Sequence, residues 1–352
     1  MKPSTDKNSA TPVNKRRVAK RPRGGATDNR QKRRRRGVNH GLVVGVDIGG
    51  SNLRVALADL HGNIVGRWNA STKATSSPER VVAQIEEGID CLLRESSSPH
   101  RSLLSVAVGA PGATDVKSGV VLATSYLRGW KGVPLQEMLE SALGIPAAIE
   151  NDVRMAALGE HWRGAARGVD DFVFLAIGTG IGAGIFANGK LVHGAHGTAG
   201  EVGYMHVPHA PEEPARPGEP GSLERMIGGD GIAGQWRSAS DSNATFDLTA
   251  TEIFARAGNG DPRANGVLDR SAQLLAYTIY NISLVVNSAL FILGGGVGVS
   301  TPLFDATERA LERYSTPSRP RIVISGLGTD AQLMGAIQLA LTIAKQPTAS
   351  RA

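Results

Sequence analysis

The chain has 352 residues, of which 41% are hydrophobic, and a formal net charge of +7. This length and composition suffice for two compact domains, and the single cysteine excludes an internal disulfide bond. No apolar run reaches the roughly 20 residues of a membrane-spanning helix, and residues 1–40 lack the apolar core of a signal peptide. We therefore expect a cytoplasmic protein without a membrane partner.

The positive charge is concentrated in residues 1–40, which contain 14 of the 39 Lys and Arg but two of the 32 Asp and Glu. The rest of the chain, with 25 basic and 30 acidic side chains, is acidic. The basic arm has almost nothing apolar to bury and is expected to be disordered. Its run at residues 32–36 could contact nucleic-acid phosphates. Without interleaved aromatics or a helix-turn-helix pattern, a solvated extension or a wrongly assigned start is favoured over nucleic-acid binding.

Strand and helix patterns begin after residue 40. The first half predicts a buried strand that ends in Asp47, a glycine turn and two more strands, then a helix, two strands and a helix that opens at Asp152. The corresponding ranges are 42–46, 53–59, 64–68, 78–94, 103–108, 146–150 and 152–162.

The second half repeats the order of strand, glycine turn and two strands, at 172–177, 183–187 and 190–192. It continues with helices at 249–256 and 263–286, a strand at 289–293, a helix at 301–314, a strand at 321–325 and a helix at 331–344. The duplicated order predicts an α/β fold of two related lobes with mixed sheets, which flank a cleft. We place the N-terminal lobe at 41–150, which the helix at 331–345 could complete, and the C-terminal lobe at 151–330.

Three glycine clusters follow predicted strands. Glycines let main-chain N–H groups approach an anion closely, so each cluster is a candidate phosphate or nucleotide contact. The candidate residues are Asp47, Gly49, Gly50, Ser51, Asn52 and Arg54 in the first cluster, Gly178, Thr179, Gly180 and Gly182 in the second, and Gly295 and Gly296 in the third. Asp47, at the end of its strand, could also hold a hydrated magnesium ion. Residues 178–184 superficially mimic a dinucleotide-binding fingerprint, but they lie between two strands and lack the helix that this motif requires.

Together these stretches resemble the ROK family of sugar kinases and repressors, which belongs to the actin-like ATPase superfamily. The similarity extends over almost all of the chain after residue 40 and is carried by DIGGSNLR (47–54), GAPG (109–112), ENDVRMAALGE (150–160), GTGIGAGI (178–185), HGAHGTAGEVG (193–203) and LGGGVG (293–298). The resemblance implies two actin-like (ribonuclease H-like) lobes around an active-site cleft, with ATP phosphates on the first two glycine clusters and adenosine near residue 295. It also implies a homodimer or homotetramer.

Asp152 is the candidate catalytic base. It follows a strand and opens a helix, where a ligand can reach its carboxylate, and phosphoryl transfer needs a group that accepts the proton of the attacking hydroxyl. An Asp at this position can also be a simple helix N-cap, and this alternative is disfavoured only by the surrounding motifs. The resemblance assigns the base to Asp152 and places Asn151, Glu201 and Glu224 around the sugar hydroxyls.

The sequence departs from the family at positions that shape the substrate shell. Typical members carry a zinc-binding His and three Cys, where this chain has Tyr204, Ala215, Pro217 and Ser222. We therefore expect no zinc site, and Tyr204 becomes a candidate substrate contact. His206 and His209 alone make a poor zinc site. Many sugar kinases of the family also have Asn at the position of Tyr126.

The resemblance and the retained motifs predict an ATP- and Mg²⁺-dependent kinase that phosphorylates the hydroxymethyl hydroxyl of a hexose or a sugar-like cyclitol. Three alternatives stay open: a glucokinase proper, a C7-cyclitol 7-kinase of an aminocyclitol biosynthetic pathway, and a ROK-type sugar-responsive transcriptional regulator. The sequence alone does not identify the acceptor. The lack of an N-terminal winged helix and the retention of Asp47 and Asp152 favour catalysis over regulation.

Overall fold

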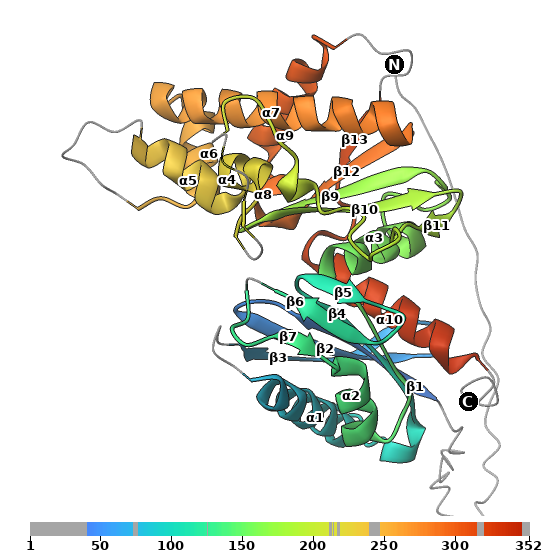
Figure 1. Cartoon of the computed structure of the whole chain (residues 1–352). Helices are drawn as coiled ribbons and strands as arrows, with labels where there is room; N and C mark the ends of the chain where they lie inside the picture. Colours follow the sequence, from blue (N-terminus) through green and yellow to red (C-terminus); the bar gives the residue numbers. More distant parts are fainter. Residues whose placement is uncertain are drawn as a thin grey trace, which may run out of the picture. The chain divides into compact units, whose positions relative to one another are not determined.

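The computed structural model describes residues 41–72, 77–124, 126–210, 213, 215–216, 219–238, 247–314 and 320–346. The predicted basic arm, residues 1–40, lies outside this range. The described residues belong to one compact unit in which two five-stranded sheets are the main elements (Figure 1).

The first sheet has the order β3-β2-β1-β4-β8. Its strands are β1 (Leu42–Ile48), β2 (Asn52–Asp59), β3 (Ile64–Ser71), β4 (Leu103–Ala110) and β8 (Ala147–Asn151). β1, β2 and β3 pair antiparallel, whereas β1, β4 and β8 are parallel. Helices α1 (Pro78–Glu95) and α2 (Leu135–Leu143) cover one face and α10 (Ala331–Ala344) covers the other, so every residue of β1 is buried (Figure 1).

The second sheet repeats this arrangement in the order β11-β10-β9-β12-β13. Its strands are β9 (Phe172–Ile177), β10 (Ile181–Ala187), β11 (Lys190–Leu191), β12 (Leu290–Gly294) and β13 (Arg321–Ile324). β9, β10 and β11 are antiparallel, and β9, β12 and β13 are parallel. Helix α3 (Asp152–Arg163) packs on one face, and α6 (Ala250–Gly258), α7 (Pro262–Val286) and α9 (Thr301–Leu311) contribute to the core on the other.

The expected α/β class with mixed sheets is therefore confirmed. The sequence missed a small antiparallel sheet of β5 (Ala113–Asp115), β6 (Val120–Ala123) and β7 (Lys131–Val133), which lies between the predicted strands of the first half. It also missed α4 (Ser222–Ile227), α5 (Gly229–Ser238) and the third glycine cluster's short helix, α8 (Gly295–Gly298). The remaining elements are the short helices η1 (His100–Ser102), η2 (Val202–Tyr204) and η3 (Gly328–Asp330). The lobe boundary at residue 150 stays a prediction.

Helices α3 and α10 cross in close main-chain contact. A Cβ atom added to Gly335 would lie 1.8 Å from the carbonyl oxygen of Met155, and one added to Gly159 would lie 2.1 Å from that of Ala331. Real Cβ atoms do not approach so closely, so both helices need glycine at the crossing. The start of α3, which carries Asp152, is thereby held at a fixed distance from α10.

We expect Gly335→Ala to destabilise the protein by about 1–3 kcal/mol because the added methyl group must push the helices apart. Gly266→Ala on α7 is the matched control. Its added Cβ has only Arg270 Nη1 nearby, at 3.8 Å, so the higher helix propensity of alanine should stabilise the protein by about 0.5–1 kcal/mol. Urea-induced unfolding of both variants measures the difference, and equal effects would contradict the close crossing.

Candidate active site

The site lies where the parallel strands of the first sheet end. Strand pairing places Asp47 of β1 opposite Gly109 of β4, and Gly109 opposite Glu150 of β8. Asn151 and Asp152 follow directly at the junction of β8 and α3. Because the carboxyl ends of parallel strands meet at one edge of a sheet, Asp47 and Asp152 are brought together although they are far apart in sequence.

Asn151, rather than Asp152, is the N-cap of α3. Its Oδ1 atom accepts hydrogen bonds from the main-chain N–H groups of Val153 and Arg154 at 3.0 and 3.1 Å. Its Nδ2 group donates to the carbonyl oxygen of Gly112 and to Oδ1 of Asp152, both at 3.0 Å. The amide that the resemblance places at the sugar is thus used to orient the neighbouring carboxylate.

Asp152 has one oxygen fixed and one available. Oδ1 accepts from the main-chain N–H of Val153 at 2.9 Å as well as from Asn151, whereas no hydrogen bond from the described residues ends on Oδ2. Burial, followed by the negative charge of Asp47, raises the pKa of Asp152 to about 7. Such a carboxyl group can accept and release a proton near neutral pH.

Asp47 is buried and paired with Arg54 of β2. The Nε atom of Arg54 donates to Oδ2 of Asp47 at 2.8 Å, and Nη2 contacts the same oxygen. Burial raises the pKa of Asp47, while the charge of Arg54 acts in the opposite direction. Arg54 also donates to the carbonyl oxygen of Thr329 at 2.6 Å and to Oε1 of Gln332 at 3.0 Å. The sequence placed Arg54 at the nucleotide but did not predict this pairing.

The first glycine turn connects β1 to β2. The main-chain N–H of Gly49 donates to the carbonyl oxygen of Asn52 at 2.8 Å, and the Thr72 hydroxyl donates to the carbonyl oxygen of Gly49 at 2.6 Å. Gly50 and Ser51 lie at the tip of this turn, between the two strands. Contact of this turn with phosphate stays a prediction.

The second glycine turn, at residues 178–180, connects β9 to β10. Its Gly178 carbonyl accepts from the main-chain N–H of Gly229 at 2.7 Å, and a Cβ atom on Gly228 would lie 2.8 Å from the carbonyl oxygen of Thr179. Gly182 lies further along, inside β10, where its Cα faces Val153 of α3. Gly182 thus packs against α3, and its contact with the nucleotide stays a prediction.

The third glycine cluster lies beside the second turn. Gly295 has a φ of +78°, and a Cβ atom on it would lie 2.4 Å from the carbonyl oxygen of Ile177, the last residue of β9. Gly296 follows in α8, with no atom within 4 Å of an added Cβ. The second and third clusters are therefore adjacent at one edge of the second sheet.

The predicted acceptor carboxylates come from two segments near the second turn. Glu224 of α4 accepts from the main-chain N–H of Ile181 at 3.1 Å, and burial raises its pKa. Burial also raises the pKa of Glu201, against the charge of Arg154, although Glu201 keeps an exposed surface. The charge of Glu201 acts in turn on Asp152, so these groups share one electrostatic environment. Tyr204 of η2 is 52% exposed.

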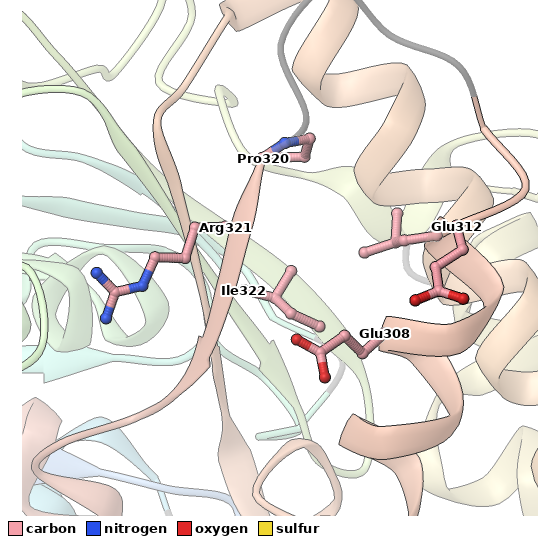
Figure 2. Close-up of a pocket in the computed structure, with 6 residues that line it drawn as sticks. Glu308, Glu312, Pro320, Arg321 and Ile322 are labelled. Atoms are coloured by element: carbon pink, nitrogen blue, oxygen red, sulfur yellow. The ribbon is translucent and has the colours of Figure 1, made fainter.

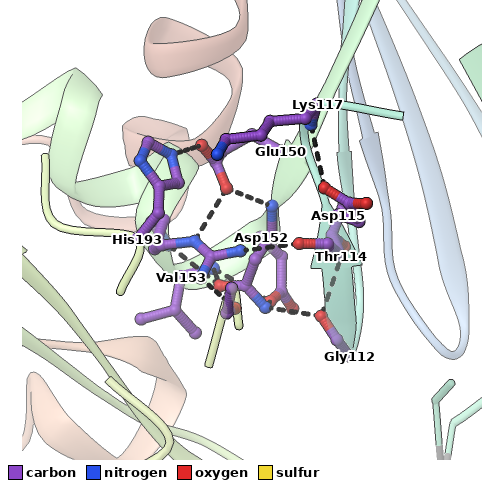
Figure 3. Close-up of polar contacts among 11 residues, drawn as sticks. Gly112, Thr114, Asp115, Lys117, Glu150, Asp152, Val153 and His193 are labelled. Atoms are coloured by element: carbon purple, nitrogen blue, oxygen red, sulfur yellow. Dashed lines mark hydrogen bonds and ion pairs between the residues drawn. The ribbon is translucent and has the colours of Figure 1, made fainter. Parts of the chain in front are cut away.

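Glu150 forms a network with Arg154 and His193 that the sequence did not predict, and Figure 3 labels Glu150 and His193 within it. Glu150 accepts from Arg154 Nε at 2.7 Å, and its other oxygen lies 2.7 Å from His193 Nε2. Burial would raise the pKa of Glu150, but the His193 hydrogen bond and the Arg154 charge lower it overall. Glu150 is on β8 and Arg154 is on α3, so the helical i, i+4 rule does not apply to this pair and the sequence carried no local signal for it.

Arg154 is 2% exposed and joins distant segments. Its Nη1 donates to the carbonyl oxygen of Gly197 at 2.7 Å and its Nη2 to that of Thr114 at 3.3 Å. The segment that contains Gly197 leads directly to Glu201. One buried arginine thus links the start of α3, β5 and the segment that leads to Glu201, a predicted acceptor contact.

The positions at which the resemblance expects zinc ligands are Tyr204, Ala215 and Ser222 in the described chain, while Pro217 lies outside it. Within the described ranges, no group of three or more His, Cys, Asp or Glu side chains is arranged to hold a metal ion. His206 and His209 do not form such a group.

A cavity of about 470 Å³ lies elsewhere, between α9 and β13 (Figure 2). Its lining residues are Glu308, Leu311, Glu312, Pro320, Arg321 and Ile322. None of the predicted site residues lines it, and it has no glycine turn for a phosphate group. We therefore do not assign it to the site.

Comparison with known proteins places this geometry in context. The sequence model of a protein family described as the ROK family matches residues 43–343 of this chain. A glucokinase of Halalkalibacterium halodurans is 31% identical over 83% of this chain and 92% of its own length, and a β-glucoside kinase of Listeria innocua is 32% identical over 74% and 84%. The crystal structure of a ROK family glucokinase from Streptomyces griseus, in complex with glucose and AMPPNP, is similar at a TM-score of 0.72 and 26% identity, over 86% of this chain and 100% of that chain. These matches confirm the family resemblance and the fold class.

Across the described residues, none of the helices is both long enough and apolar enough to cross a membrane.

We expect Asp152→Asn to raise the melting temperature at pH 8 by roughly 3–6 °C. The pKa of about 7 lies above the ordinary 3.8, so the ionised carboxylate destabilises the folded state. This destabilisation is complete above pH 7 and fades as the pH falls towards 4. The side-chain oxygen of asparagine can still accept the hydrogen bonds from Asn151 and from the main-chain N–H of Val153. The substitution therefore mainly removes the negative charge of residue 152.

Thermal melts of both proteins at pH 8 and pH 5 measure the effect, and the gain should shrink at pH 5. Asp305→Asn, on the exposed side of α9, controls for the change in net charge. A gain of the same size at both pH values, or an equal gain in the control, would contradict the raised pKa.

Proposed function

The chain belongs to the ROK family, and we propose that it is an ATP-dependent kinase that phosphorylates the hydroxymethyl hydroxyl of a hexose or a sugar-like cyclitol. The observation that supports this most directly is Asp152, which has one oxygen held by two donors, one oxygen available and a pKa of about 7. Relatives with the names glucokinase and β-glucoside kinase support the same class of reaction.

In the proposed mechanism, the Oδ2 atom of Asp152 accepts the proton of the acceptor hydroxyl. The hydroxyl oxygen forms a bond to the γ-phosphorus of ATP as the bond between that phosphorus and the β,γ-bridging oxygen breaks, and ADP leaves with the electron pair. The raised pKa matches a group that must be ionised before the reaction and protonated after it. Asn151 keeps the carboxylate oriented throughout.

The two glycine turns are the proposed contacts for the ATP phosphates. The first follows Asp47 in the chain, and the second is joined to Glu224 through the main-chain N–H of Ile181, so each turn adjoins a carboxylate of the proposed site. Asp47 fits a hydrated magnesium ion, because its Oδ1 accepts no hydrogen bond from the described residues and Mg²⁺ is bound through few carboxylates plus phosphates. The ion, when bound with ATP, neutralises charge on the phosphate oxygens.

Glu201 and Glu224 are the proposed acceptor contacts. Carboxylates accept hydrogen bonds from the hydroxyl groups of a polyol. The charge of Glu201 acts on the proposed base, Asp152, and the charge of Glu224 acts on Glu201. Tyr204 and Tyr126 alter this shell, so we propose that the acceptor need not be glucose, and C7-cyclitols with an exocyclic hydroxymethyl group remain candidates. A cytoplasmic location and a homodimer or homotetramer also stay predictions.

We expect the purified protein to release ADP with at least one member of a panel of hexoses, amino sugars and C7-cyclitols. Asp152→Asn should lower kcat by about 10²- to 10⁴-fold, since it removes the base but keeps the fold. Asp305→Asn is the matched control and should retain wild-type turnover. Wild-type turnover in Asp152→Asn would refute the mechanism. Absence of ADP release with every acceptor, together with sugar binding, would favour a regulator.

We expect kcat/KM for the acceptor to rise with pH up to about 7 and then level off. Below that pH, protonation of Asp152 removes the base, so the rate should fall about tenfold per pH unit. Initial rates between pH 5 and 8.5 at saturating ATP test this dependence. A profile that is flat across this range would show that no group with this pKa controls the reaction.

A further inference from the structure

Tyr126 lies between the two glycine turns. It follows β6 and precedes β7, and its main-chain N–H donates to the Thr124 hydroxyl oxygen at 3.1 Å. A Cβ atom added to Gly50 would lie 3.4 Å from Cβ of Tyr126, and one added to Gly180 would lie 2.3 Å from its hydroxyl oxygen. The tyrosine side chain therefore extends from the first turn to the second.

The hydroxyl end of Tyr126 is beside Glu224. The Cβ atom added to Gly180, which would lie 2.3 Å from the Tyr126 hydroxyl oxygen, would also lie 2.5 Å from Oε2 of Glu224. The hydroxyl oxygen and this carboxylate oxygen are therefore neighbours. Burial, followed by the charges of Glu224 and Asp152, raises the pKa of Tyr126. The phenol therefore stays protonated at neutral pH, and its hydroxyl can donate a hydrogen bond to a carboxylate or to an acceptor oxygen.

The loop that carries Tyr126 is anchored by its neighbours. Leu127 and Trp130 are each 1% exposed and belong to the core of the first sheet, whereas Tyr126 is half-buried and belongs to none of the described core clusters. The core therefore accounts for the position of the loop but not for the choice of tyrosine at its tip.

We propose that Tyr126 determines which acceptors the enzyme takes. Its ring limits the space between Gly50 and Gly180, and its hydroxyl orients Glu224 towards one acceptor hydroxyl. The favoured acceptor is a single polyol ring whose hydroxyl near Glu224 is unsubstituted, and a second sugar ring at that position is excluded. This inference rests on the proposed kinase function.

Two substitutions test the roles of the Tyr126 hydroxyl and of its ring separately. Tyr126→Phe should raise the KM of the best acceptor by about twofold to tenfold, the range for one lost hydrogen bond, with the KM of ATP changed by less than about twofold. Tyr126→Ala should raise the kcat/KM of a β-linked disaccharide relative to that of the single-ring acceptor by at least about tenfold, because it opens the space. Tyr314→Phe, whose ring stacks on Tyr280 at 4.7 Å, is the matched control and should change none of these ratios.

The outcomes distinguish this inference from the proposed function. An inactive wild-type protein overturns both. If the wild type is active, unchanged acceptor KM in Tyr126→Phe and an unchanged disaccharide ratio in Tyr126→Ala overturn the role of Tyr126 alone. A rise in the KM of ATP without a change for the acceptor also overturns it. Should Tyr126→Ala melt at a lower temperature, Tyr126→Phe, which keeps the ring, decides the question.

Discussion

The placement of Asp152 depends on the close packing of α3. Glycines at the crossing with α10 bring the two main chains into contact, and both helices cover sheets that they help to bury. At its other end, α3 carries the fully buried Glu160, which accepts from the main-chain N–H groups of Leu327 and Ala165 at 3.0 and 2.6 Å. A helix fixed at its middle and at its end can present its first residue in one position, as a catalytic base requires.

This rigidity holds carboxylates together that repel one another. Burial and the charge of Asp47 both oppose ionisation of Asp152, and Glu201 adds to the repulsion. Arg54 compensates Asp47, while Arg154 compensates Glu150 and acts on Glu201 from a buried position. Among the described contacts, no arginine pairs with Asp152 to compensate its negative charge. The fold thus keeps an uncompensated charge at Asp152, the carboxylate whose proton affinity the proposed mechanism uses.

The sequence predicted what local patterns encode. Apolar runs located the strands of both sheets, and the glycine clusters located the turns, because each signal lies within a few adjacent residues. It could not predict that Tyr126 reaches Gly180 or that Arg154 binds the carbonyl of Gly197, since these contacts join segments that only the tertiary fold brings together. It also named Asp152 as a possible N-cap, whereas the structure gives that role to Asn151. The short strands of β5, β6 and β7 escaped because three or four residues carry too little periodicity.

The segments that carry Glu201 and Glu224, the proposed acceptor contacts, are held together by main-chain contacts. Where the resemblance expects zinc ligands, the segments of Glu201 and Glu224 are joined directly. The main-chain N–H of Leu223 donates to the carbonyl oxygen of Met205 at 3.1 Å, and a Cβ atom on Gly221 would lie 2.3 Å from the carbonyl oxygen of Gly203. Leu223 is fully buried beneath this contact. Main-chain pairing and one apolar anchor can therefore set the spacing of the two carboxylates.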